Sequence, residues 1–370
     1  MLDAAVAYSR ATGKRKFLSV MQRYMDYILT VFGPDPDQIH GYPGHEEIEL
    51  ALCKLYDETG EKKYLDLAAY FINERGQDPK FFQEELKTRG DTFHWEGNDL
   101  AEPEYFQAHA PVREQKDAAG HAVRAVYLYT GMADVAMRTG DESLKEACRT
   151  LMRSITQRRM YVTGGIGSTV HGEAFTFDYD LPNDTVYAET CASVGLMFFA
   201  KRMLKMDGDA AYADILERAL YNTVLAGMSL DGKAFFYVNP LEVYPDADHK
   251  DPTKRHVKTV RQKWFACACC PPNVARLLAS LGEYIYQGDG AGVSVNLLIG
   301  SELSFSHQGQ PVRLEQRSEV PFDGKVSFTV RCEGAVRFAL RVRRPFWAGE
   351  VSCDAPYRME KGYMVLERDW

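Results

Sequence analysis

The chain lacks the dense cysteines, the signal peptide and the long apolar runs that are typical of secreted disulfide scaffolds and membrane proteins. Eight cysteines in 370 residues are too few for a disulfide framework. The N-terminal residues Met1 to Ala4 form neither the charged nor the apolar region of a signal peptide. No apolar run approaches the roughly 18 residues that a transmembrane helix needs. We therefore expect a cytoplasmic protein without a membrane partner.

Positive charge is also in short supply. Lysine and arginine number 44 against 52 aspartate and glutamate residues, and the net charge is -8. The basic clusters at 14–16 and 341–344 are too short to reverse this balance, so no nucleic-acid surface is expected. With 45% apolar and 26% charged residues, the composition is that of a globular protein. A neutral or small-molecule partner fits it better.

Most of the chain carries a helical apolar pattern that glycines interrupt. Four apolar-periodic stretches end at a Thr-Gly or Asp-Gly pair, and a further helical stretch opens four residues later. A glycine C-cap between two helices is typical of an antiparallel helical hairpin. Unequal spacing argues against a regular solenoid and favours a ring of hairpins with long loops, an α/α toroid over residues 1–287. The four glycines are Gly13, Gly60, Gly140 and Gly208.

After about Gly288 the apolar period changes from 3.6 to 2. Apolar residues alternate over 293–299, 326–330 and 336–342, with Gly and Pro turns between these stretches. This pattern predicts antiparallel strands with one buried face. We predict a β-sandwich domain over residues 288–370.

Two short fragments together hold three thiols and a carboxylate. Glu189 and Cys191 are two residues apart, and the adjacent pair Cys269 and Cys270 precedes two prolines. Such a set suffices for one tetrahedral Zn²⁺, although both pairs need non-ideal backbone to converge. Pro271 is expected to keep Cys270 extended just before a helix. Unrelated buried cysteines and a redox pair are the alternative interpretations.

Two histidines lie on the inward stripes of predicted helices. His45 is in line with Ile48 and Leu52, and His121 is in line with Ala125 and Leu128. Each alone is more typical of a hydrogen-bonded core histidine. Because both are expected at helix starts, a toroid would place them at the mouth of its cavity. The long loops hold further polar and aromatic candidates: Trp95, His109, His171 and Tyr237.

Seven motifs follow one another along the chain: GHAVRA at 120–125, GMAD at 131–134, YVTGGIGS at 161–168, HGEAF at 171–175, YDLPN at 179–183, YAETCA at 187–192 and CCPPN at 269–273. Together they resemble the motifs of glycoside hydrolase family 127, the β-L-arabinofuranosidases, and the resemblance covers roughly residues 40 to 290. The resemblance implies an (α/α)₆ barrel followed by β-sandwich domains. Family members are longer, so the chain is expected to be shortened at both ends, as a fragment, a remnant or a divergent short form. About nine of the twelve barrel helices are expected.

The resemblance also assigns roles to the thiols. It implies that Zn²⁺ is the cofactor and that Cys269 is the nucleophile. Zinc would hold that thiol as a thiolate near neutral pH and orient it. The implied ligands are Glu189, Cys191, Cys269 and Cys270.

A retaining glycosidase also needs a proton donor on the leaving-group side of the sugar. The resemblance implies that Glu173 is this general acid/base; without it, a solvated loop carboxylate would be expected. It further implies that His45, His121 and Tyr237 line the sugar pocket.

The hypothesis is thus a zinc-dependent retaining glycosidase that releases β-L-arabinofuranose from a small carbohydrate through a cysteine thioglycosyl intermediate. One alternative is a non-catalytic carbohydrate-binding remnant of that fold. Another is a helical protein with a purely structural zinc site. An incomplete helical ring exposes apolar flanks, so self-association into a homo-oligomer is a further expectation.

Overall fold

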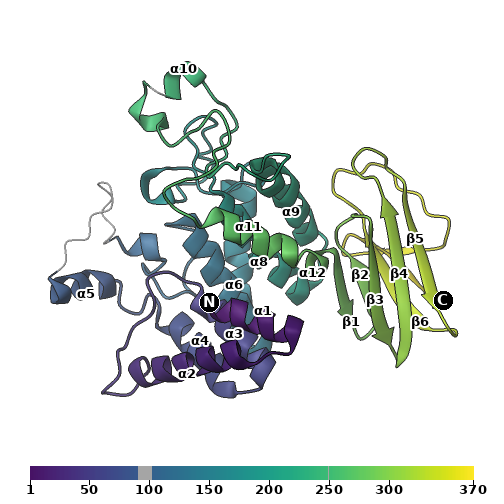
Figure 1. Ribbon diagram of the computed structural model, residues 1–370, viewed down its shortest axis with the longest axis horizontal. Coiled ribbons are helices and arrows are strands. Elements are labelled where there is room, and N and C mark those ends of the chain that lie inside the picture. The colour runs from purple at the N-terminus through teal and green to yellow at the C-terminus, as the bar shows by residue number, and fades with distance from the viewer. Residues whose placement is uncertain (91–101, 249) are drawn as a thin grey trace.

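The protein consists of a helical body and a smaller β body, shown by a computed structural model (Figure 1). The structure describes residues 1–90, 102–248 and 250–370, so Trp95 lies outside the described residues. One continuous apolar core runs from the helices into the strands. Within these ranges, no helix is both long and apolar enough to cross a bilayer.

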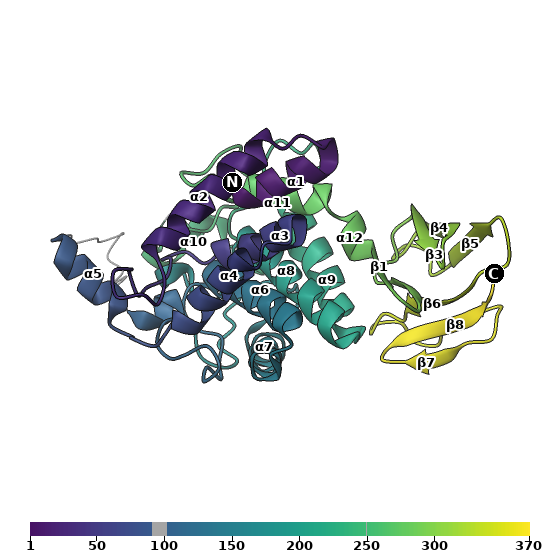
Figure 2. The ribbon, with the colours of Figure 1, turned by 90° about the horizontal axis from the view of Figure 1, so that it is seen from below.

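Nine helices of the described residues form the wall of the ring (Figure 2). Five contact one another in chain order: α1 (Leu2–Thr12), α3 (Ile48–Thr59), α6 (Ala122–Thr139), α8 (Thr190–Asp207) and α11 (Cys270–Ala279). The other four each pack behind the preceding helix: α2 (Lys16–Val31), α4 (Lys62–Glu74), α7 (Glu142–Ser154) and α9 (Ala211–Ala219). This arrangement agrees with the predicted toroid and with its expected helix count.

Glycine ends each of the four helices that begin a hairpin. Gly13, Gly60, Gly140 and Gly208 cap α1, α3, α6 and α8 with φ between 67° and 73°. Glycine adopts this left-handed conformation without the steric cost that a Cβ brings. The chain can therefore reverse into the next helix, as the sequence predicted.

The remaining helices lie in connections or lead into the strands. In Figure 1, α5 (Phe81–Arg89) and α10 (Pro245–Asp248) lie at the edge of the helical body. Single turns are η1 (Pro103–Phe106), η3 (His171–Glu173), η5 (Pro252–Lys254) and α12 (Gly282–Ile285). Two wider turns, η2 (Ile155–Arg159) and η4 (Leu220–Leu225), continue α7 and α9.

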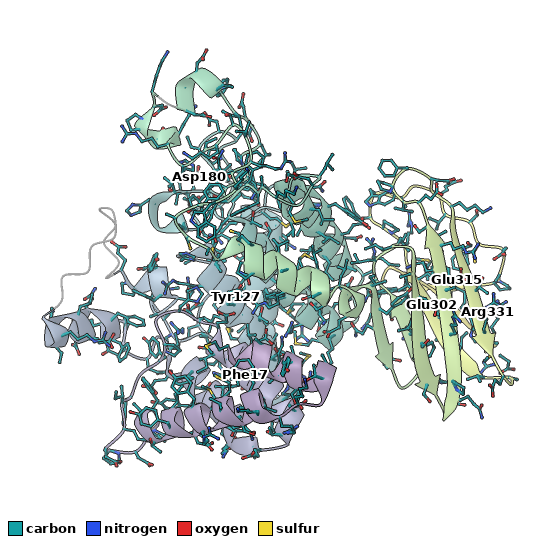
Figure 3. The ribbon with its side chains drawn as sticks, in the orientation of Figure 1. Phe17, Tyr127, Asp180, Glu302, Glu315 and Arg331 are labelled. Atoms are coloured by element: carbon teal, nitrogen blue, oxygen red, sulfur yellow. The ribbon has the colours of Figure 1, made fainter. Side chains whose placement is uncertain are left out.

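The β body contains two sheets. One has the strand order β1 (Tyr286–Asp289), β2 (Gly292–Val295), β6 (Arg337–Arg343), β8 (Tyr363–Asp369) and β7 (Arg358–Glu360). The other is the meander β3 (Ser301–His307), β4 (Gln310–Ser318) and β5 (Val326–Cys332). Their inner faces meet where the rings of Phe305 and Phe338 pack edge to face, 5.6 Å apart. Glu302, Glu315 and Arg331 lie on the meander (Figure 3), with Glu302 opposite Glu315 in register.

One strand pair departs from the antiparallel prediction. β2 and β6 run parallel, because the chain between them first builds the whole second sheet and then returns. A parallel pair requires such a long crossover. The first strand also begins earlier than predicted, at Tyr286.

Arg343 joins the two bodies. Its side chain has no exposed surface and forms ion pairs from β6 to Asp214 and Glu217 on α9. Glu217 also accepts a hydrogen bond from the indole Nε1 of Trp347 at 2.6 Å. The β body is thus connected to the ring through buried charge.

We expect Arg343→Met to lower the free energy of unfolding by about 3–5 kcal/mol, because it leaves two carboxylates near the interface without their cation. Urea denaturation followed by circular dichroism measures this change. Arg317→Met is the control, since Arg317 pairs with Glu315 at the surface and should matter by less than about 1 kcal/mol. Equal effects of the two substitutions would contradict the role of Arg343 in joining the two bodies.

Candidate active site

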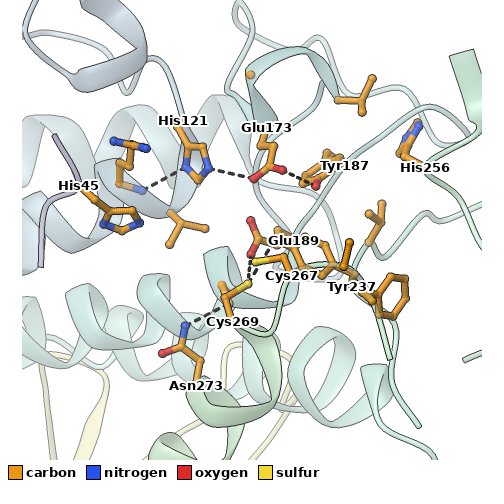
Figure 4. Close-up of a pocket in the computed structure, with 18 of the residues that line it drawn as sticks. His45, His121, Glu173, Tyr187, Glu189, Tyr237, His256, Cys267, Cys269 and Asn273 are labelled. Atoms are coloured by element: carbon orange, nitrogen blue, oxygen red, sulfur yellow. Dashed lines mark hydrogen bonds and ion pairs between the residues drawn. The ribbon is translucent and has the colours of Figure 1, made fainter. Parts of the chain in front are cut away.

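One pocket of about 920 Å³ contains most of the residues that the sequence singled out (Figure 4). Its wall comes from the N-terminal ends of α6, α8 and α11 and from the loops beside them. Cys270 is fully buried directly behind the wall. His109 and His171, two of the loop candidates, do not line it. The predicted residues in the wall are His45, His121, Glu173, Glu189, Cys191, Tyr237 and Cys269.

The three thiols and the carboxylate of Glu189 form one compact cluster. The sulfur of Cys270 lies 3.5 Å from that of Cys191 and 3.7 Å from that of Cys269. The Oε1 atom of Glu189 lies 3.2 Å from the Cys269 sulfur. All four ligand atoms lie within 4.8 Å of one another. Two sulfurs bound tetrahedrally to Zn²⁺ at about 2.3 Å are about 3.8 Å apart, so this spacing fits the ion.

The backbone explains how residues two apart and residues adjacent in sequence converge. Glu189 is the N-cap of α8 with extended dihedral angles (φ -58°, ψ 139°), whereas Cys191 lies inside the helix. The change of conformation between them cancels the divergence that an ideal helix would impose. Both α8 and α11 direct their N-terminal ends at the cluster, and that end of a helix favours negative charge.

The expectation that Pro271 keeps Cys270 extended is wrong. Cys270 is the first residue of α11, and Cys269 already has helical dihedral angles (φ -74°, ψ -42°). Proline is tolerated in the first helical turn, where its missing N–H would have no partner in the helix. The helix therefore starts one residue before the proline.

The cluster brings four acidic groups together, and their negative charges would repel one another. Burial raises the pKa of Glu189 far above its ordinary value, and the charges of Cys269 and Glu173 add to this rise. The pKa of Cys269 lies below its ordinary value because Cys191 and Cys270 donate hydrogen bonds to its thiolate. The Oε2 atom of Glu189 is buried and has no hydrogen-bond partner in the described part of the chain. A bound cation would satisfy that oxygen and allow the four groups to ionise together.

Glu173 approaches the pocket from η3 and is held by two neighbours. The Tyr187 hydroxyl donates a hydrogen bond to Oε1 at 2.6 Å, and Oε2 lies 2.9 Å from Nε2 of His121. Burial favours the neutral acid, but these hydrogen bonds outweigh burial and lower the pKa of Glu173. Glu173 also has a positive φ of 51°, a strained conformation that is concentrated at functional sites.

Burial favours the neutral form of both histidines. His121 caps α6, and its Nδ1 accepts a hydrogen bond from the Arg124 backbone N–H, which leaves the proton on Nε2 to face Glu173. Burial lowers the pKa of His121, and burial with the Arg124 charge lowers the pKa of His45 to about 4. Contrary to expectation, His45 lies in the loop before α3, which begins at Ile48. A neutral imidazole both donates and accepts hydrogen bonds, as sugar hydroxyls require.

The structure adds residues that sequence reasoning missed. The Nδ2 group of Asn273 donates a hydrogen bond to the Cys191 sulfur at 3.0 Å. Arg276 pairs with the pocket residue Glu47 at 2.9 Å. Asn273 and Tyr187 were inside quoted motifs, but only the fold shows what they contact. Arg276 lies two helical turns after Cys269, so both side chains share one face of the helix. This spacing could have predicted that Arg276 lies at the pocket.

Comparison with known proteins places this geometry in a family. Residues 1–283 match the family model of the GH127 β-L-arabinofuranosidase catalytic domain, and residues 292–370 match that of its middle domain. A non-reducing end β-L-arabinofuranosidase of Bifidobacterium longum subsp. longum is 48% identical over 356 residues, 94% of this chain and 53% of that protein.

Solved structures agree with this result. The crystal structure of a GH127 β-L-arabinofuranosidase from Geobacillus stearothermophilus T6 has a TM-score of 0.93 and 54% identity, covering 100% of this chain and 59% of that one. A second GH127 β-arabinofuranosidase has a TM-score of 0.85 and 37% identity, covering 100% and 56%. The chain thus spans little more than half the length of these relatives. Because the two domain models account for nearly every residue, the chain belongs to glycoside hydrolase family 127.

Proposed function

We propose that this chain supplies the catalytic pocket of a retaining β-L-arabinofuranosidase. Family membership and the activity named for the relatives support the reaction class. One observation carries the proposal: a thiol and a hydrogen-bonded carboxylate share the same pocket. Glu189 approaches both, 3.2 Å from the Cys269 sulfur and within 4.8 Å of Glu173.

The thiol cluster is proposed to hold Zn²⁺ through Glu189, Cys191, Cys269 and Cys270. The sulfur spacing, the unpaired Glu189 oxygen and the two helix N-termini support this assignment. When bound, the ion supplies the positive charge that keeps the Cys269 thiol ionised near neutral pH.

The reaction follows from the two proposed groups. The Cys269 sulfur attacks the anomeric carbon while the bond to the leaving oxygen breaks and Glu173 gives that oxygen its proton. Glu173 then accepts a proton from water, whose oxygen attacks the same carbon and breaks the carbon–sulfur bond. Two displacements on opposite faces retain the anomeric configuration. The bound sugar excludes water from Glu173, which favours the protonated acid that the first step needs.

The sugar hydroxyls are proposed to bind His45, His121 and Tyr237. The two imidazole rings are 6.4 Å apart, and the Tyr237 hydroxyl lies 3.2 Å from the Cys269 sulfur. These three side chains therefore surround the space above the nucleophile.

Turnover of an aryl β-L-arabinofuranoside by zinc-loaded protein tests the proposal. We expect hydrolysis, with β-L-arabinofuranose as the first product seen by NMR. Sugar binding without hydrolysis would favour the carbohydrate-binding alternative over the enzyme. Release of the α-anomer as the first product would exclude a retaining mechanism.

Protein purified from zinc-replete cells should carry about one Zn²⁺ per chain. Cys191→Ser should lower this content severalfold, because serine is a poor ligand for the ion. Cys353→Ser, in the β body, serves as the matched control and should keep the metal. Elemental analysis by mass spectrometry measures the stoichiometry. Wild-type protein without zinc, with Cys191→Ser behaving identically, would count against the site.

Tyr187→Phe should move the alkaline limb of the kcat/KM profile to higher pH by about one unit. The hydroxyl stabilises the ionised form of Glu173, so its removal raises the pKa of the acid. The first step requires protonated Glu173, and activity then persists to higher pH. Tyr161→Phe, whose hydroxyl bonds the Pro182 carbonyl instead, should leave the limb in place. A shift toward lower pH in Tyr187→Phe would refute this coupling.

A further inference from the structure

The chain segment that closes one side of the pocket is strongly basic. Residues 250–263 contain six lysines and arginines and one acid, Asp251, in a chain of net charge -8. Arg255 and Lys258 from this segment line the pocket. The reaction proposed above uses neither of them.

Two of the other four cations of this segment have partners that explain them. Lys254 forms an ion pair with Asp184. Arg261 donates a hydrogen bond to the Ala226 carbonyl and lies over the ring of Phe236.

Arg255 and Lys258 differ from these residues. Both are exposed, and neither forms an ion pair with any residue that the structure describes. Lys258 only donates a hydrogen bond to the Arg255 backbone carbonyl at 3.2 Å. The carboxylates in the pocket wall are engaged elsewhere: Glu47 with Arg276, Glu173 with His121 and Tyr187, and Glu189 in the thiol cluster. Two positive charges therefore face the pocket without a counterion.

The segment that carries these charges passes the acid at His256. From Glu173, contacts lead to the Tyr187 hydroxyl at 2.6 Å and then to the His256 ring, which stacks on Tyr187 with centroids 5.9 Å apart. Figure 4 shows His256 beyond Tyr187, on the side of Glu173 away from His45. His256 adjoins Arg255 in the chain and is itself anchored by the Thr185 carbonyl at 3.2 Å. Because a general acid protonates the leaving oxygen, the leaving group extends along this side.

We propose that Arg255 and Lys258 form a leaving-group subsite that selects arabinofuranosides linked to a sugar acid. The inference rests on the proposed hydrolase function. A planar carboxylate matches the donor fork of arginine, and a lysine beside it adds a second charge. The side chains of Tyr187 and His256 line the pocket wall beside the acid. A volume of about 920 Å³ leaves room for a second sugar ring beside the pentose.

The test compares two disaccharides in which arabinofuranose is joined through the same hydroxyl to glucuronic acid or to glucose. We expect at least a tenfold higher kcat/KM for the acid at low ionic strength, decreasing as salt screens the exposed cations. Arg255→Ala and Lys258→Ala should each reduce this preference severalfold. Lys263→Ala, a cation of the same segment outside the pocket wall, should preserve it.

The outcomes separate the subsite from the hydrolase. Hydrolysis of both disaccharides at equal rates, unchanged in Arg255→Ala, would overturn the subsite and leave the hydrolase standing. If neither disaccharide nor the aryl β-L-arabinofuranoside is hydrolysed, the hydrolase proposal fails, and calorimetric binding of the same two disaccharides tests the subsite directly. Tighter binding of the acid that is lost in Arg255→Ala supports the subsite, whereas equal binding overturns it.

Discussion

Cys269→Ser is expected to reduce turnover of an aryl β-L-arabinofuranoside by roughly three orders of magnitude or more, while part of the bound zinc remains. A serine hydroxyl has a far higher pKa than a thiol and is a poor nucleophile without its own general base. The other three ligand side chains of the cluster are unchanged, so metal content should fall less than activity does. Single-turnover kinetics and elemental analysis on the same sample measure the two quantities.

Cys267→Ser is the matched control for this substitution. Cys267 is an exposed thiol in the same pocket wall, two residues before Cys269, and lies outside the four-ligand cluster. We expect it to retain most of the wild-type turnover. If Cys267→Ser were as inactive as Cys269→Ser, or if Cys269→Ser kept a tenth of the activity, the nucleophile would be another group.

Glu173→Gln should produce a loss that depends on the leaving group. An amide cannot donate the proton that an alcohol leaving group needs, so arabinofuranosides of sugars should lose roughly 10² to 10⁴ in kcat/KM. An aryl leaving group departs without protonation, so its first step should be nearly preserved. Water attack, which needs the base, should then become rate-limiting and give a burst of the released phenol.

Rescue by azide distinguishes the loss of the acid/base Glu173 from a general loss of structure. The azide anion needs no deprotonation, so it should restore steady-state turnover of the aryl substrate by Glu173→Gln and yield a glycosyl azide. Equal losses for both leaving groups, with no rescue by azide, would show that Glu173 is not the acid/base.

Local signals allowed most of the helical ring to be predicted. A glycine with positive φ at the end of each apolar stretch marks a helix C-cap within a few residues, as at Gly60 and Gly140. The parallel pairing of β2 and β6 has no such signal, because it depends on where a crossover of about forty residues returns. The predicted extended conformation of Cys270 was wrong for another reason. A residue before proline usually avoids the helical conformation, but this preference is weaker in the first turn of a helix. Cys270 lies there, as the first residue of α11.

The same distinction holds for the site. Motifs identified the residues that could carry chemistry, yet their contacts depend on chain segments far apart in sequence. Tyr187 is recognisable as a partner of Glu173 only once α8 and η3 are in place. Arg255 and Lys258 look like ordinary solvated charges in sequence, and only the fold shows that both line the pocket.

The most direct measurement is mass spectrometry of protein treated with a mechanism-based β-L-arabinofuranose probe. The account predicts one adduct per chain on the peptide that contains Cys269, absent from Cys269→Ser and accumulating in Glu173→Gln. An adduct on Glu189, Cys267 or any residue other than Cys269 would contradict it.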